Sequence, residues 1–120
     1  MLELKRISCG YGAFQAVHGL SLSLRPGTIT GLLGANGAGK SSTLMCIAGH
    51  VQRQSGAIEL DGEDICSLGP TERVRNGIAI SPEGRRLFKD LTVEDNLRVG
   101  GMVQPAHVFA QDRDRVLSLF

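Results

Sequence analysis

The chain has 120 residues, a formal net charge of +1, 42% hydrophobic residues and 21% charged residues. This balance is ordinary for a globular protein. It excludes an intrinsically disordered chain, which would combine low hydrophobicity with a high net charge. The adjacent arginines Arg85 and Arg86 are isolated and are interpreted as part of a solvated loop, so we expect no nucleic acid among the partners.

Apolar patterning predicts three strands in the first third of the chain. The first begins at residues 2–4 and is expected to break at residues 9–12, where two glycines occur. Residues 20–24 alternate leucine and serine, which is the period of a half-buried strand. After a Pro-Gly turn, residues 28–33 are more uniformly apolar and are predicted to form a strand covered on both faces.

The middle of the chain alternates short elements with glycine stops. Residues 40–48 predict a helix with Gly49 just past its end. Residues 57–60 and the dipeptide Asp61-Gly62 predict a strand and a hairpin turn, with the return starting at Asp64. A short helix is expected at residues 71–76, closed by Gly77, and a buried strand at residues 78–80.

Two helices are expected in the last third. Thr92 is predicted to be the N-cap of a helix, because Asp95 follows three residues later. The helix is expected to run through about Leu97. A last helix is expected from about Gln104. Its apolar stripe would contain Val108, Val116, Leu119 and Phe120. The chain stops on an apolar residue, which looks like a cut rather than a natural terminus.

The strongest motif lies between the third predicted strand and the first helix. It reads Gly34-Ala35-Asn36-Gly37-Ala38-Gly39-Lys40-Ser41 and matches the phosphate-loop pattern G-x-x-x-x-G-K-[ST] in full. The small residues let consecutive backbone amides surround a triphosphate, and the helix adds its positive N-terminal end. An apolar strand before the motif and a helix after it favour this interpretation over a chance glycine-rich turn.

The side chains at the end of the motif complete the predicted site. Lys40 supplies a mobile positive charge for the β- and γ-phosphates, and the Ser41 hydroxyl is placed to ligate the Mg²⁺ that bridges them. Ser42 and Thr43 add hydroxyls in the first helical turn. We therefore predict that the chain binds ATP together with Mg²⁺.

Four segments together resemble the ATP-binding subunit of ABC transporters. They are Tyr11 with the strand at residues 20–24, the phosphate loop continued through Ser42-Thr43-Leu44, the run Ser55-Gly56-Ala57-Ile58 with Asp61-Gly62, and residues 80–97 with Leu91-Thr92-Val93-Glu94-Asp95-Asn96-Leu97. The resemblance implies an α/β P-loop NTPase (RecA-like) core with an N-terminal antiparallel β subdomain, incomplete at the C-terminus. It also implies that Tyr11 stacks on adenine.

The resemblance covers the whole chain but only the N-terminal part of the family's nucleotide-binding domain. Residues 1–120 contain no Leu-Ser-Gly-Gly-Gln signature, no Walker B strand ending in Asp-Glu and no switch histidine. In the family, hydrolysis needs a glutamate after Walker B and the signature of a second subunit. Glu94 and Asp95 are interpreted as helix-cap and surface charges, so we expect this part alone to be inactive as an ATPase.

Glu83 narrows the resemblance to one subgroup. Most ABC ATPases carry glutamine there, in a loop that senses the γ-phosphate and Mg²⁺. The form Pro82-Glu83-Gly84-Arg85-Arg86 is similar to subunits that serve the import of branched-chain amino acids, urea or short amides. A carboxylate can approach Mg²⁺ directly or through water but donates no hydrogen bond when ionised. The predicted metal ligands are thus Ser41 and Glu83.

The resemblance also implies partners and a location. We expect a second ATP-binding subunit, as a homodimer or heterodimer, and transmembrane permease subunits contacted near Glu83 to Phe88. The chain would then lie on the cytoplasmic face of the inner membrane, held through the permease. No apolar run is long enough to cross a bilayer or to form a signal peptide. Three scattered cysteines are expected to be reduced and mostly buried, as in a cytosolic protein: Cys9, Cys46 and Cys66.

Two alternatives remain open from the sequence. A P-loop kinase for a small molecule would need a lid with paired arginines; Arg85 and Arg86 are the candidates, and the run at residues 91–97 argues against it. A nucleotide-binding fragment without turnover is the second. A signature and an Asp-Glu strand downstream in the reading frame would separate it from an ATPase. Solute choice belongs to other subunits, so these residues do not specify the solute; the resemblance to the subgroup implies import, with branched-chain amino acids as the expected solute.

Overall fold

The computed structural model describes residues 1–84 and 86–120. They form two compact units, Met1–Ile80 and Ser81–Phe120. Arg85, one member of the predicted arginine pair, lies outside the described residues. In the part of the chain that the structure describes, no helix combines the length and apolar character needed to cross a membrane.

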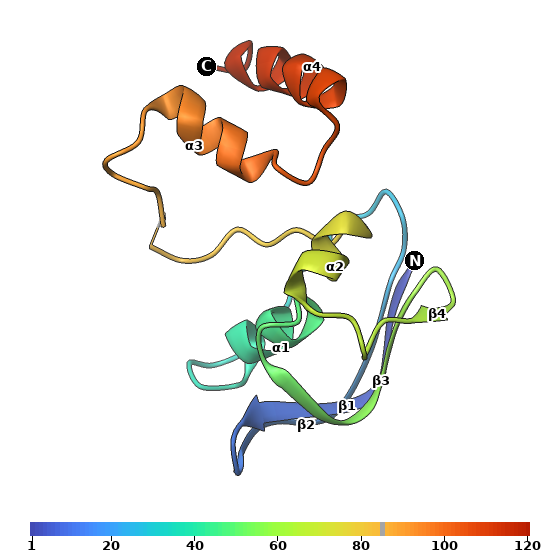
Figure 1. Ribbon diagram of the computed structural model, residues 1–120. Helices are drawn as coiled ribbons and strands as arrows, with labels where there is room; N and C mark the ends of the chain where they lie inside the picture. The colour runs from blue at the N-terminus through green and yellow to red at the C-terminus, as the bar shows by residue number, and fades with distance from the viewer. Residues whose placement is uncertain (85) are drawn as a thin grey trace. The chain divides into compact units, whose positions relative to one another are not determined.

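The first unit is built on a four-stranded antiparallel sheet (Figure 1). Its strands are β1 (Leu2–Tyr11), β2 (Phe14–Leu24), β3 (Gln52–Leu60) and β4 (Glu63–Asp64), in the order β2-β1-β3-β4. The strands predicted at residues 2–4, 20–24 and 57–60 are confirmed. The turn at Asp61 and Gly62 is confirmed too, with φ of 51° and 89°, the two positive values that a tight hairpin turn requires.

The break expected at residues 9–12 is wrong for residues 9–11, because β1 continues to Tyr11 and the chain turns only at Gly12. Cys9 pairs with Val17 of β2 and with Arg53 of β3, and Gly10 is likewise paired on both sides. A central strand gains a ladder on each edge, and this pairing outweighs the weak strand propensity of glycine.

A bulge at Arg6 sets which residues of β1 face the core. Arg6 has a φ of 49°, and the pairing with β2 shifts register between Leu4 and Ile7. Strict alternation from Leu4 would turn position 6 inward. The bulge instead leaves Arg6 exposed and buries Ile7 and Cys9, both of which are fully enclosed.

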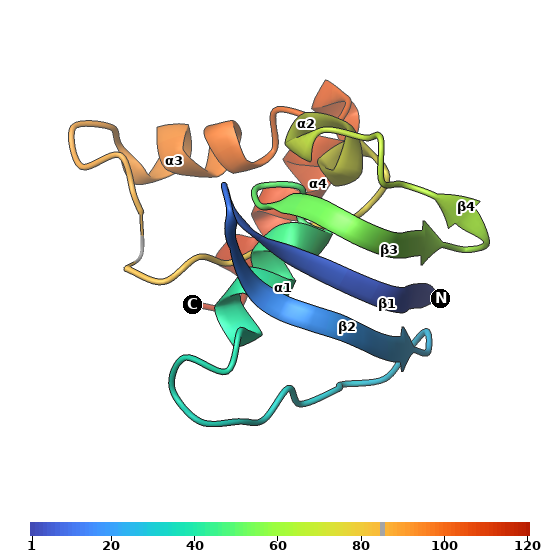
Figure 2. The same cartoon turned by 90° about the horizontal axis from the view of Figure 1, so that it is seen from below.

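Helix α1 (Lys40–Ile47) packs across one face of the sheet, against β1, β2 and β3 (Figure 2). Gly49 ends it as predicted, in the left-handed conformation at a φ of 83°. The N–H groups of Gly49 and His50 donate to Cys46 and Met45 at 3.1 and 2.8 Å, which closes the helix end. The buried core between helix and sheet contains Leu4, Ile7, Cys9, Val17, Cys46, Ile47, Val51, Ile58 and Ile65.

The short helix expected at residues 71–76 is confirmed as α2 (Pro70–Arg75). Glu72 accepts a hydrogen bond from the Gly69 N–H at 2.8 Å and so closes the N-terminal end of the helix. Gly77 ends it, donating to the Val74 carbonyl at 3.0 Å.

Two predicted strands do not form, at residues 28–33 and 78–80. The first was predicted as a strand covered on both faces and the second as a buried strand, and a strand needs a hydrogen-bonded neighbour to exist. Among residues 1–84 and 86–120, no segment pairs with either one. The apolar side chains of the first segment are left in solvent: Ile29 is 103% exposed and Leu33 is 93% exposed.

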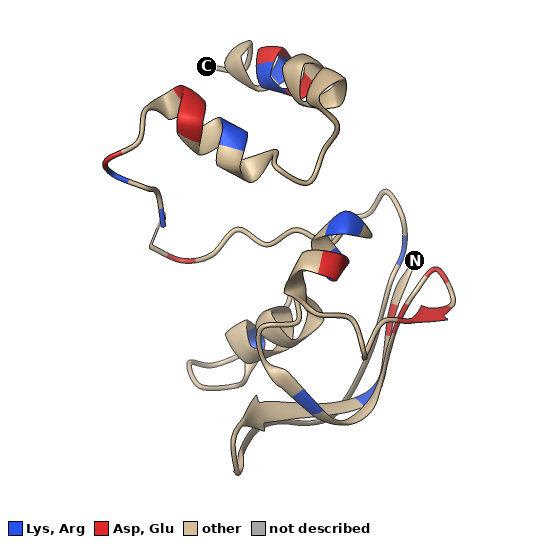
Figure 3. Cartoon of the chain, in the orientation of Figure 1, with Lys and Arg blue, Asp and Glu red and all other residues tan. Residues whose placement is uncertain are grey.

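The second unit contains helices α3 (Val93–Gly100) and α4 (Ala106–Leu117). Thr92 is the N-cap that the sequence predicts: its hydroxyl accepts from the Asp95 N–H at 3.1 Å and donates to the Asp95 carboxylate at 2.6 Å. Acidic residues lie at the start of α3 and an arginine in its last turn (Figure 3), the order that the helix dipole favours. The helix reaches Gly100, three residues beyond the predicted Leu97.

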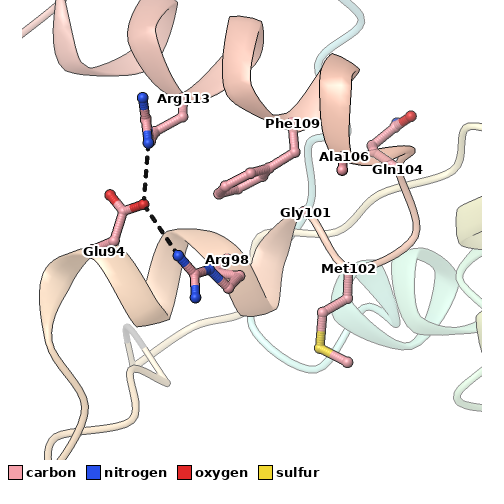
Figure 4. Close-up of a pocket in the computed structure, with 8 residues that line it drawn as sticks. All are labelled: Glu94, Arg98, Gly101, Met102, Gln104, Ala106, Phe109 and Arg113. Atoms are coloured by element: carbon pink, nitrogen blue, oxygen red, sulfur yellow. Dashed lines mark hydrogen bonds and ion pairs between the residues drawn. The ribbon is translucent and has the colours of Figure 1, made fainter.

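Two side-chain contacts connect α3 and the residue that follows it to α4: the ring of Phe109 and a cluster of ion pairs around Glu94 (Figure 4). The Glu94 carboxylate lies 3.3 Å from Arg113 of α4 and 3.7 Å from Arg98 of its own helix. The Phe109 ring lies so close to Gly101 that an added Cβ would meet its Cδ2 at 2.3 Å. The predicted stripe is correct only for Val108 and Val116, which are half-buried. Because α4 ends at Leu117, Leu119 and Phe120 lie beyond it and are exposed.

We predict that the isolated chain self-associates, because exposed apolar side chains such as Ile29 and Leu33 are lowered in free energy by contact with another copy. The double variant Ile29→Lys/Leu33→Lys should raise the monomer fraction in sedimentation velocity. The control Ser23→Lys adds charge at an exposed polar position of β2 and should change the fraction little. A cooperative, reversible melt of the monomeric wild-type chain would contradict this expectation.

Candidate nucleotide-binding site

The predicted phosphate loop forms a turn that leads into α1. The Ala38 N–H donates to the Ala35 carbonyl at 3.2 Å, and Gly37 and Gly39 have φ of 83° and 84°. Gly39 is needed for space as well, because a Cβ there would lie 2.7 Å from the carbonyl oxygen of Ala16. The loop is therefore seated directly against β2, and Gly37 and Gly39, but not Gly34, have a positive φ that glycine adopts at little cost.

Helix α1 begins without a side-chain cap. Its N-cap is Gly39, and its first turn contains no acidic residue. Within the described residues, the backbone N–H groups of Lys40, Ser41 and Ser42 donate to no acceptor. Unpaired N–H groups at the positive end of a helix form an anion site. This is the arrangement that the motif predicts for a phosphate.

The Lys40 side chain folds back over the loop. Its ammonium donates to the carbonyl oxygens of Gly34 and Ala35 at 2.8 and 2.7 Å. Lys40 is the first residue of α1, and residues 34–39 contain no charged side chain. The cation is thus held at the loop, where a phosphate oxygen would compete with the two carbonyls for it.

The three hydroxyl residues after Lys40 differ in their surroundings. Ser41 is exposed and Ser42 is half-buried. Thr43 is 2% exposed, and its hydroxyl donates to the Gly39 carbonyl at 2.9 Å. Thr43 therefore fixes the first turn of α1, and direct contacts of the three residues with ATP stay predictions.

A cavity of about 340 Å³ adjoins the loop in the first unit. Lys40 is the cationic group on its wall, and the remainder is mainly apolar. The loop residues 34–38 are exposed, so a triphosphate can reach them from solvent. The cavity is lined by Ala16, Val17, His18, Leu20, Leu32, Leu33, Ala38, Lys40 and Thr43.

Tyr11 and Glu83 stay predictions. Tyr11 ends β1 opposite Phe14 and is 56% exposed, so its ring is accessible for stacking. Glu83 is an exposed residue of the second unit. No group of three His, Cys, Asp or Glu side chains gathers to hold a metal in the described ranges.

Sequence reasoning missed Arg73, which contacts the phosphate-loop helix. It is 3% exposed and donates to the carbonyls of Cys46 and Ile47, at the C-terminal end of α1. A lone arginine in a short helix gives no local signal for such a contact.

The three cysteines are free thiols, as predicted. Cys9 and Cys46 are buried between β1 and α1, and the Cys9 thiol donates to the Ser42 carbonyl at 3.7 Å. Burial raises the pKa of Cys46 to about 12 and also raises the pKa of Cys9. Both are therefore neutral, inert core residues at physiological pH.

Comparison with known proteins identifies the family. A family model described as ABC transporter matches residues 17–120. The chain belongs to the ABC transporter family. This membership argues against the small-molecule kinase.

Curated relatives differ in what their names say they transport. The chain is 43% identical over 120 residues to the high-affinity branched-chain amino acid transport ATP-binding protein BraG of Pseudomonas aeruginosa, covering all of this chain and 52% of the relative. It is 40% identical over 96 residues to the lipopolysaccharide export system ATP-binding protein LptB of Escherichia coli K12, covering 80% of this chain and 40% of the relative. The chain thus spans about half the length, or less, of these proteins.

A solved structure confirms the predicted fold class. An ATP-binding subunit of an ABC transporter superposes with a TM-score of 0.73 at 35% identity, over 85% of this chain and 42% of that chain. The fold is therefore that of the N-terminal part of an ABC cassette, with its antiparallel sheet. Within the described residues, the strands predicted at residues 28–33 and 78–80 do not form as hydrogen-bonded strands.

We predict that folding stability falls as the pH rises above about 9. The folded pKa of Cys46 lies near 12, against its ordinary 9.0, so the unfolded chain loses this proton first. The stabilisation is complete below pH 9 and is lost progressively up to pH 12. Urea midpoints measured from pH 8 to 11 should decline in the wild type and decline less in Cys46→Ala.

The control Val51→Ala truncates a buried side chain that does not titrate, and it should keep the wild-type slope. Cys9 leaves a residual slope in Cys46→Ala, because its pKa is raised as well. An equal decline in Cys46→Ala and in the wild type would refute the assignment.

Proposed function

We propose that the chain binds ATP with Mg²⁺ through residues 34–41, as the N-terminal part (residues 1–120) of one ABC nucleotide-binding domain. The uncapped start of α1 carries the proposal, because three N–H groups there donate to no acceptor in the described residues and the Lys40 ammonium is held at the same loop. Membership of the family supports ATP as the nucleotide.

On ATP binding, the Lys40 ammonium would exchange its hydrogen bonds to loop carbonyls for hydrogen bonds to phosphate oxygens. The Lys40 ammonium, now 2.8 and 2.7 Å from two loop carbonyls, would turn to the β- and γ-phosphates, where the hydrogen bonds join opposite charges. The exposed Ser41 hydroxyl would ligate Mg²⁺, which neutralises phosphate charge. Glu83 would add a carboxylate, directly or through water.

Hydrolysis belongs to the complete subunit in this proposal. Glu94 pairs with Arg98 and Arg113, and Asp95 is held by the Thr92 cap, so neither is placed as a free general base. The chain by itself would then bind ATP without turnover, and a second ATP-binding subunit would complete the active dimer.

For the complete transporter we propose uptake of branched-chain amino acids. The likeness to BraG extends over the whole chain, and the Pro82-Glu83-Gly84 form points to the same subgroup. The relative LptB serves export and is nearly as similar, so the phosphate loop does not specify the solute. The permease would make that choice and would hold this subunit at the cytoplasmic face of the inner membrane.

An apolar groove in the second unit supports the permease contact. A cavity of about 440 Å³ lies beside Leu87 and Phe88, whose side chains are 65% and 57% exposed. The Asn96 amide shapes the groove, because it accepts from the Phe88 N–H and donates to the Phe88 carbonyl, both at 3.0 Å. Phe88 is thus presented to solvent on a fixed backbone.

We predict that Lys40→Ala weakens Mg-ATP binding about 10- to 100-fold, the scale of one or two lost hydrogen bonds between charged groups. Isothermal titration calorimetry of the 120-residue chain measures this directly. Lys89→Ala removes an equal charge from the second unit and should leave the affinity unchanged. Equal affinity of Lys40→Ala and wild type would remove the proposal.

We predict that Phe88→Asp in the complete subunit lowers leucine uptake by cells while leaving Mg-ATP affinity intact. A buried charge at a permease contact is costly, whereas the phosphate loop is untouched. Leu119→Asp alters an exposed apolar residue that does not line the groove and serves as the control. Wild-type uptake by Phe88→Asp would exclude the groove as the permease contact.

A further inference from the structure

Arg73 is an arginine buried to 3% exposure in the core of the first unit. Within residues 1–84 and 86–120, no carboxylate pairs with it. Its guanidinium instead donates to backbone carbonyls: Cys46 at 2.7 Å, Ile47 at 2.8 Å, Leu68 at 2.9 Å and Cys66 at 3.5 Å. A buried cation whose hydrogen bonds all go to backbone carbonyls indicates that the side chain holds that part of the backbone in place.

The two shortest contacts reach the C-terminal end of α1. The last carbonyls of a helix lack internal partners and form its negative end. Helix α1 carries no basic residue of its own in its last turn. The Cys46 carbonyl also accepts from the Gly49 N–H at 3.1 Å, so Arg73 brings to α1, from helix α2, the cation that its last turn lacks and further donors for its last carbonyls.

Gly49 leaves the space through which Arg73 passes. A Cβ at Gly49 would lie 3.2 Å from both Cδ and Nε of Arg73. The same glycine terminates α1 in the left-handed conformation. The same residue, Gly49, thus ends the helix and leaves room for the Arg73 side chain.

We propose that Arg73 is a positioning residue for the phosphate site, which rests on the ATP-binding function proposed above. Helix α1 has 8 residues and is a rod about 12 Å long, so its two ends move together. By fixing the carbonyls of Cys46 and Ile47, Arg73 fixes the direction of the free N–H groups at Lys40–Ser42 and the base of the Lys40 side chain.

The test compares Arg73→Met and Arg73→Lys with Arg75→Met in the 120-residue chain. Arg75 is an exposed arginine of the same helix, so its loss matches the charge change without touching α1. Mg-ATP affinity is measured by calorimetry at a temperature where circular dichroism shows each variant folded. We expect about tenfold weaker binding for Arg73→Met, an intermediate loss for Arg73→Lys and no change for Arg75→Met.

A second readout separates positioning from general stability. Amide hydrogen exchange without nucleotide should accelerate in α1 of the Arg73 variants more than in β1 and β3. The variant Ile58→Val, which removes one methylene from the buried core, should accelerate exchange across the sheet and keep Mg-ATP affinity. If Arg73→Met does not fold, Arg73→Lys decides alone, because it keeps the charge and loses the several donors.

Each outcome has a separate meaning. Folded Arg73 variants with wild-type affinity overturn the proposal, as does an equal loss of affinity in Ile58→Val. If the wild-type chain binds no Mg-ATP, the proposed function fails. Faster exchange confined to α1 in the Arg73 variants would then still show that Arg73 holds the helix, and wild-type exchange there would overturn the positioning role.

Discussion

An uncapped helix start lowers stability by about 1 kcal/mol relative to a capped one, because its first N–H groups lack partners. Helix α1 has such a start, and the first unit is arranged to hold it in place. Gly39 lies against β2, Cys46 and Ile47 are buried in the core, and Arg73 binds the far end. These contacts fix the helix without using the N–H groups that a phosphate would need.

The sheet supplies the rigid surface for this helix, and β1 is its centre. Pairing with β2 and β3 satisfies both edges of β1, and the bulge at Arg6 turns Ile7 and Cys9 toward α1. Cys9 links the two layers directly, because its thiol donates to the Ser42 carbonyl. A packing change in β1 would therefore be felt in the first turn of α1, where the proposed phosphate contacts lie.

Features specified by neighbouring residues could be predicted from the sequence. The glycine turn of the phosphate loop, the Thr92 cap and the helix ends at Gly49 and Gly77 all depend on contacts within a few residues. Features specified by distant partners could not. The run of β1 through Gly10 depends on both neighbouring strands, and Arg73 meets carbonyls 26 and 27 residues away. Residues 28–33 have strand composition but no partner strand among the described residues, so propensity alone gave a wrong prediction.

The two units differ in what they could recognise: the first unit a phosphate group and the second unit a protein partner. In the first unit, the loop and α1 suit any triphosphate, because backbone N–H groups and one ammonium recognise phosphate and nothing beyond it. Relatives named for amino-acid transport and for lipopolysaccharide export are nearly equally similar to this chain, as a solute-independent loop requires. In the second unit, the exposed Phe88 on its Asn96-bound backbone offers side-chain shape that a partner can distinguish. Under the permease contact proposed above, selectivity between permeases would be found in residues near Phe88, whereas exchange of residues 34–41 between relatives would leave partner choice unchanged.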